Sequence, residues 1–114
     1  MKNSSLFKVV FCVFFFSSTI GNALTIQEAE EKANEVCAAC HGKDGVNGVL
    51  PSYPIIAGQY SDYLNQALMD YKSGARKNAV MGGIAATLTK EEMLGLARYF
   101  ASLPTPLNDK NRKD

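Results

Sequence analysis

The sequence predicts an all-α fold, with three main helices and long loops rich in glycine and proline. Two observations lead to this prediction. Apolar residues recur at helical spacing in three segments, two of which begin with a Thr-x-x-Glu capping pattern. After residue 23 there is no alternating run of β-branched residues, the pattern typical of strands.

Residues 1–23 have the pattern of a secretory signal peptide. A basic start with two lysines precedes the apolar run Val9–Phe16, and small residues lead to an expected cleavage after Ala23. The run is too short to span a bilayer, which needs about 20 residues. Cys12 lies inside this leader and leaves with it. The protein is therefore expected in the periplasm and not as an integral membrane protein.

Removal of the leader leaves one domain, expected over residues 24–104, and a charged tail over 105–114. Ten Lys and Arg face eleven Asp and Glu after residue 23, and this balance argues against a nucleic-acid partner. Phe100 is the one phenylalanine left, and the chain has no tryptophan. Large apolar side chains are thus scarce, and a buried prosthetic group could supply what they lack.

The first helix is expected to begin at Thr25, because Glu28 follows at the spacing of a capping box. Its apolar residues continue into the cysteine motif at residue 37. The second helix is expected to follow Ser61 and to stop at Gly74. The third is expected to begin at Thr89 and to end before Pro104.

Two loops separate these helices. Residues 42–59 contain four glycines and two prolines, which argues against regular structure. Residues 73–87 are expected to form the second loop, in which Met81 is followed by Gly82 and Gly83. Loops of this length are usually functional or disordered, and a bound ligand would give them a surface to wrap around.

Cys37, Cys40 and His41 form a Cys-x-x-Cys-His pattern, and His41 is the only histidine. Two cysteines on one helical turn can form thioethers with the two vinyl groups of a porphyrin. The adjacent imidazole can then bind the iron from one face. This pattern indicates one covalently bound haem c.

Three other interpretations of the motif fit less well. A zinc site usually needs four ligands, and only three Cys or His residues remain after residue 23. A thiol-disulfide redox pair is expected at a helix start in a βαβ setting, whereas this motif falls at the end of a predicted helix in a chain without predicted strands. A disulfide between Cys37 and Cys40 would close only a very small loop.

The sixth position of such an iron needs a ligand from elsewhere in the chain. Met69 and Met93 fall within predicted helices, and Met93 fits an apolar stripe where methionine commonly fills the core. Met81 lies in a predicted loop beside two glycines, where backbone can approach a flat ring closely. We therefore assign Met81 as the second axial ligand. Without it, the iron would be five-coordinate or open to water.

Three stretches in order, "CAACHG", "YPIIAGQYSDYLNQALMDYKSGARKNAVM" and "LTKEEMLGLARYFASL", resemble bacterial class I c-type cytochromes. The resemblance covers essentially all of the predicted domain. It implies that the first and last helices cross, near Ala29 or Ala33. It also implies that the carbonyl of Pro54 accepts a hydrogen bond from His41. The N-terminal helix departs from the family in having no aromatic residue before Cys37.

Further residues are candidates for secondary roles. Gln59 and Tyr60 could donate hydrogen bonds to a haem propionate, and Arg76 could pair with one, although each could equally be an ordinary core or surface residue. The lysines that could form a docking patch, if they do more than solvate the surface, are Lys43, Lys72 and Lys77.

An iron ligated by both His41 and Met81 has no open position for a substrate, which argues against an enzyme. We expect a soluble one-electron carrier that meets other redox proteins, such as a reductase and an oxidase, through transient contacts. The alternative is a cytochrome subunit held by a flavin or quinone dehydrogenase. A haem sensor would require Met81 to be absent from the iron.

Overall fold

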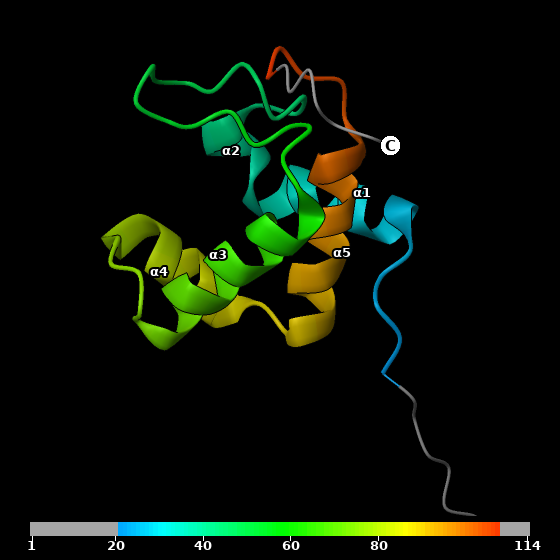
Figure 1. Cartoon of the computed structure of the whole chain (residues 1–114), viewed down its shortest axis with the longest axis vertical. Helices are drawn as coiled ribbons and strands as arrows, with labels where there is room; N and C mark the ends of the chain where they lie inside the picture. Colours follow the sequence, from blue (N-terminus) through cyan, green and yellow to red (C-terminus); the bar gives the residue numbers. More distant parts are fainter. Residues whose placement is uncertain (1–20, 108–114) are drawn as a thin grey trace, which may run out of the picture.

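The computed structural model describes residues 21–107, and this part of the chain is helical without strands, as predicted. It contains α1 (Ile26–Val36), α2 (Ala38–His41), α3 (Ser61–Ser73), α4 (Ala79–Thr87) and α5 (Lys90–Ser102) (Figure 1). Most of the expected signal peptide, with Cys12, and most of the expected charged tail lie outside the described residues. No described helix is both long enough and apolar enough to cross a membrane.

Capping interactions fix the starts of α1 and α5 where the sequence predicts them. Thr25 Oγ1 accepts a hydrogen bond from the backbone N–H of Glu28, whose carboxylate accepts one from the N–H of Thr25. Thr89 and Glu92 make the same reciprocal pair at the start of α5. Each pair satisfies two N–H groups that a helix start otherwise leaves unpaired.

The first predicted helix is interrupted at the cysteine motif. Cys37 ends α1 and precedes α2, with a φ of −112° that departs from regular helix geometry. The backbone N–H of His41 still donates to the carbonyl of Cys37 at 3.0 Å. The motif therefore occupies a separate helical turn set against the end of α1.

The prediction of a loop over residues 73–87 is wrong for its second half, because residues 79–87 form α4. Asn78 supplies the start signal, since its side-chain oxygen accepts hydrogen bonds from the N–H groups of Val80 and Met81, at 3.0 and 2.9 Å. Gly82 and Gly83 lower helix propensity but do not prevent the helix. Met81 thus lies in the first turn of a helix and not in a loop.

The core lies where α5 packs against α1 and α3. Small residues of α1, Ala29 and Ala33, are buried and allow the close approach of α5. Tyr99 and Phe100 of α5 meet edge to face, with ring centroids 5.2 Å apart. Met93 is 2% exposed and fills this core, the role expected of it. The first and last helices therefore pack together as the resemblance implies.

The loop between α2 and α3 arches over one end of the helices (Figure 1) and is tied to them by backbone hydrogen bonds. The carbonyl of Gly45 accepts from the N–H groups of Ile56 and Ala57, and Gly58 N–H donates to the carbonyl of Phe100 at 2.8 Å. Gly45 has a φ of +68°, and a Cβ there would lie 3.0 Å from the ring of Phe100. Glycine is required at this position by both conformation and space.

Gly83→Ala is expected to stabilise the protein, and Gly95→Ala to destabilise it. A Cβ at Gly83 meets nothing within 4 Å, so alanine adds helix propensity worth about 0.5–1 kcal/mol. A Cβ at Gly95 of α5 would lie 2.7 Å from Cβ of Leu24, and this clash should cost about 1–3 kcal/mol. Urea unfolding of the two variants measures both changes in the free energy of unfolding. A change of the same sign in both variants would contradict the difference in space around Gly83 and Gly95.

Glu92→Gln is expected to lower the free energy of unfolding at pH 7 by about 0.5 kcal/mol. The backbone N–H of Thr89 holds the pKa of Glu92 below its usual value, and Lys32 at 3.1 Å also lowers it. A lowered pKa in the folded state means that this stabilisation is present above the ordinary pKa of glutamate. It is lost as the pH falls through the depressed value.

The difference between Glu92→Gln and the wild type should therefore be present at pH 7 and absent in acid, below the depressed pKa of Glu92. Urea unfolding over this pH range measures it. Glu91→Gln, in the same helical turn, is the control for the general effect of removing one charge. An equal loss in both variants would assign the effect to the helix start and not to the Glu92 contacts.

Candidate haem site

The cysteine motif forms one wall of a cavity. Cys37 precedes α2, and Cys40 and His41 follow within its single turn, so all three side chains line the same cavity. Both cysteines are free thiols. The arrangement places two sulfur atoms and one imidazole at one side of a shared space, as attachment of a porphyrin requires.

His41 is 8% exposed and is oriented by the loop that follows α2. Its Nδ1 donates a hydrogen bond to the carbonyl oxygen of Pro54 at 3.1 Å, because a carbonyl can only accept. The proton on Nδ1 leaves Nε2 with a free electron pair, the form in which histidine binds a metal. The ring of Tyr53 lies beside the imidazole, with centroids 6.0 Å apart.

The cavity has a volume of about 480 Å³, within the range of cofactor sites. Its walls come from α1 to α5, from the loop before α3 and from the turn before α4, and they are mainly apolar. The apolar and aromatic side chains that line it include Ile56, Tyr63, Leu64, Leu68, Tyr71, Ile84, Leu88, Leu96 and Phe100. Among the described residues that line it, Arg76 is the one with a permanently charged side chain. An apolar cavity with two thiols and an imidazole at its wall fits covalently bound haem.

Met81 lines the same cavity from α4. The lining residues of this helix and its C-cap, Val80, Met81, Ile84 and Leu88, share one face. Gly82 and Gly83 do not line the cavity, and a Cβ at either would meet no atom closer than 3.8 Å. These glycines therefore do not border the cavity in which a flat ring would lie. Helical periodicity is what turns Met81 toward the cavity.

The other methionines among residues 21–107 do not line the cavity. Met69 is 39% exposed, and its sulfur accepts a hydrogen bond from the side chain of Asn65 at 3.6 Å. Met93 is in the helical core. Within the described residues, Met81 is the methionine placed to reach a group bound in the cavity.

The thiol chemistry of the motif does not match that of a redox pair. Burial raises the pKa of Cys37 to about 11, and the neighbouring Cys40 contributes to the shift. Reactive redox cysteines have lowered pKa values, because the thiolate is the nucleophile. Across residues 21–107 there is also no cluster of three or more potential ligands placed to hold a metal ion. The motif therefore has neither the thiol chemistry of a redox pair nor the ligand set of a simple metal-ion site.

The candidates for haem propionate contacts lie near the cavity but interact with other residues. Gln59 lines the cavity, and its side-chain oxygen accepts from the N–H of Tyr60 at 2.9 Å. Arg76 is exposed at the cavity rim. Its guanidinium lies 4.9 Å from the ring centroid of Tyr71 and donates to the hydroxyl of Tyr63 at 3.4 Å.

The three candidate docking lysines are all exposed but differ in their contacts. The ammonium group of Lys72 donates to the backbone carbonyls of Ala86 and Leu88 at the end of α4. This contact was not predicted from the sequence. Most of the aromatic and apolar lining was not predicted either, although the spacing of Val80, Ile84 and Leu88 was a signal for it.

The chain is similar in sequence to a family of known proteins. The family model described as cytochrome c matches residues 26–104. Cytochrome c4 from Thiocapsa roseopersicina is 46% identical over 78 residues, which are 68% of this chain and 40% of that protein. The cytochrome subunit of sulfide dehydrogenase from Chlorobaculum tepidum is 44% identical over 68 residues, 59% of each chain.

A solved structure of cytochrome c4 from Acidithiobacillus ferrooxidans has a similar fold. Its TM-score is 0.64 at 31% sequence identity, over 68% of this chain and 49% of that one. The chain thus spans about two fifths of its cytochrome c4 relative from Thiocapsa and about half of the solved structure.

Proposed function

Because the chain belongs to the cytochrome c family of electron carriers, we propose that it is a soluble periplasmic one-electron carrier with a haem iron ligated by His41 and Met81. Its fold is the cytochrome c fold, as predicted, and the cofactor of the family is covalent haem c. Cys37 and Cys40 fit the attachment motif. The axial ligands and the location are our proposals.

The observation that carries the ligand proposal is that His41 and Met81 line one apolar cavity from two different helices. α2 packs chiefly against α1, and α4 chiefly against α3, so the two candidate ligands come from separate parts of the fold. A flat ring between them could be approached by an imidazole and by a thioether.

The bound haem supplies reversible one-electron chemistry between ferric and ferrous iron. The chain's own contribution is to hold the two ligands in place, since Pro54 orients the imidazole and α4 positions Met81. A methionine ligand favours ferrous iron and raises the reduction potential. With both axial positions taken by protein, no substrate can bind the iron, which supports a carrier and not an enzyme.

Export to the periplasm is supported by the leader pattern and by the packing of the residue that follows it. Leu24, the first residue after the expected cleavage, is partly buried against the core and contacts Gly95 of α5. Cleavage after Ala23 would leave this contact intact.

A second candidate function is that of a cytochrome subunit bound to a flavin or quinone dehydrogenase. The similarity to a cytochrome subunit of sulfide dehydrogenase favours it, since that relative is 44% identical. The carrier and the subunit would share the same haem site. They differ in whether the protein is free or held by a partner.

Met81→Ala is expected to abolish the red charge-transfer band of ferric His/Met haem and to lower the reduction potential by on the order of 0.1 V or more. The thioether is lost while His41 and the two covalent bonds to haem remain. Visible spectra and redox titration of the exported protein measure both effects. Met69→Ala is the matched control, and its spectrum should equal that of the wild type.

If Met81→Ala keeps the charge-transfer band, Met81 is not the ligand. If the wild-type protein carries no haem that resists extraction under denaturing conditions, the proposed covalent attachment itself is overturned.

Size-exclusion chromatography of the exported protein, at its natural level of expression, is expected to give haem absorbance at the mass of the free chain without its leader. A carrier that works through transient contacts should elute alone. Elution of the haem with a flavin-containing or quinone-reducing activity at higher mass would instead establish the dehydrogenase subunit.

A further inference from the structure

The helix that carries Met81 has little intrinsic stability. α4 has nine residues, two of which are the adjacent glycines Gly82 and Gly83. Glycine lowers helix propensity, and short isolated helices are marginal in water. Of its side chains, only Ala85 is buried. α4 therefore depends on contacts from outside itself to hold a defined position.

A contact from Asn78 fixes the N-terminal end of α4. The side chain of Asn78 accepts hydrogen bonds from the N–H groups of Val80 and Met81. These are two of the donors that a helix start leaves without partners. This contact lies within the chain segment next to α4, so it orders the first turn without joining it to the rest of the fold.

A second contact joins the C-terminal end of α4 to α3. The ammonium group of Lys72 donates to the carbonyl oxygen of Ala86 at 3.4 Å and also to that of Leu88, the C-cap residue. The last carbonyls of a helix lack partners within it and carry partial negative charge, so a cation is favoured there. Lys72 thus satisfies two acceptors across 14 and 16 residues of sequence.

The position of Lys72 also links α4 to the start of α5. Leu88 and Thr89 form the whole connection between the two helices, and Glu92 lies in the first turn of α5. The backbone N–H of Thr89 is the main cause of the lowered pKa of the Glu92 carboxyl, Lys32 adds to it, and the positive charge of Lys72 makes the smallest contribution. Lys72 therefore lies near the link between α4 and α5, but its direct contacts are with the end of α4.

We propose that Lys72 is a positioning residue for the haem ligand: by clamping the end of α4 to α3, it keeps Met81 at the iron. This inference rests on the proposed ligation by Met81. A thioether is a weak ligand, and a helix that is free at one end would let it leave more often. Lys72 does not touch the haem and acts through α4.

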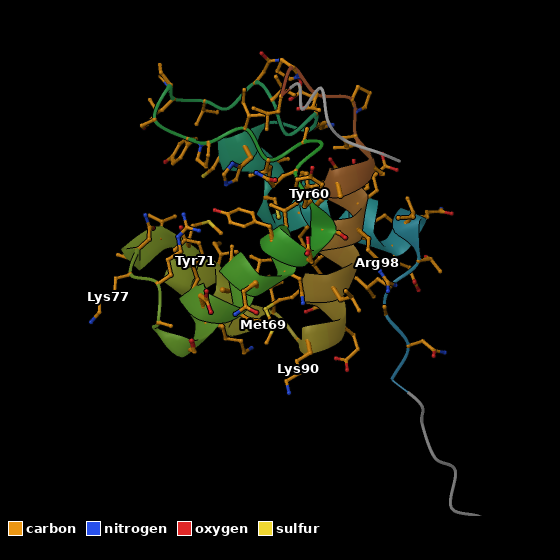
Figure 2. All side chains as sticks on the ribbon, viewed as in Figure 1. Tyr60, Met69, Tyr71, Lys77, Lys90 and Arg98 are labelled. Carbon is orange, nitrogen blue, oxygen red and sulfur yellow. The ribbon has the colours of Figure 1, made fainter. Side chains whose placement is uncertain are left out.

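Imidazole binding to the ferric, haem-loaded protein tests the proposal, because imidazole can occupy the sixth position only when Met81 leaves. Lys72→Gln removes the charge and shortens the side chain, and it should raise the apparent affinity for imidazole about tenfold. Lys72→Arg retains a cationic donor and should restore an affinity near that of the wild type. The matched control is Lys77→Gln, since Lys77 extends away from the helices on the turn before α4 (Figure 2).

The outcomes separate this inference from the proposed function. If the wild-type protein shows no charge-transfer band, the proposed ligation by Met81 is overturned. If the wild-type protein shows the band but Lys72→Gln binds imidazole with unchanged affinity, only the proposed role of Lys72 is overturned. An equal gain in imidazole affinity in Lys77→Gln would assign the effect to overall charge and would also overturn the proposed role of Lys72.

Thermal unfolding in the same samples distinguishes positioning from general destabilisation. We expect the gain in imidazole affinity at a temperature where Lys72→Gln is fully folded, and a gain confined to partly unfolded samples would contradict the proposal. If Lys72→Gln fails to retain haem, hydrogen exchange of the lysine ammonium groups in the wild-type protein tests whether Lys72 is held at the end of α4. The Lys72 group must exchange more slowly than that of Lys77, and equal rates would overturn the clamp.

Discussion

The packing of α5 against both α1 and α3 is the contact on which the rest of the structure depends. α1 leads directly into α2, which holds His41, and α3 leads into α4, which holds Met81. The two candidate ligands therefore belong to two helix pairs that α5 joins. Small side chains at Ala29 and Ala33 bring α1 close to α5, and this approach sets the distance between the pairs. The cavity is the space that remains between them.

This arrangement explains how a chain so poor in large apolar residues can hold a defined fold. Phe100 and Leu96 contribute to the helical core and also line the cavity. The same side chains therefore have a protein-facing side and a ligand-facing side. A covalently attached porphyrin would complete the apolar interior that the side chains leave unfilled. Disulfides or bound metals supply a comparable stabilisation in other small domains. Attachment through two thioethers would make that contribution permanent after export.

The sequence predicts the parts of this structure that depend on local signals. The capping pairs that begin α1 and α5, and the stop of α3 at Gly74, depend on residues three or four positions apart, and they lie where expected. α4 was not predicted, because Gly82 and Gly83 lower helix propensity and the cap that Asn78 provides was not recognised in the sequence. The contact from Lys72 could not be predicted, because it joins a side chain of α3 to backbone carbonyls 14 and 16 residues away. Spacing in sequence carries no information about such a contact.

The two sides of the candidate site differ in how firmly they are held. His41 follows Cys40, so a thioether to the adjacent residue would anchor it, and its ring is hydrogen-bonded to Pro54. Met81 has no such covalent neighbour and lies on a short helix that contributes one buried side chain. Any change of ligation should therefore begin on the α4 side. If Met81 ligates the iron as proposed, the packing of α4 against α3, more than the cysteine motif, would keep it there and would keep the reduction potential stable.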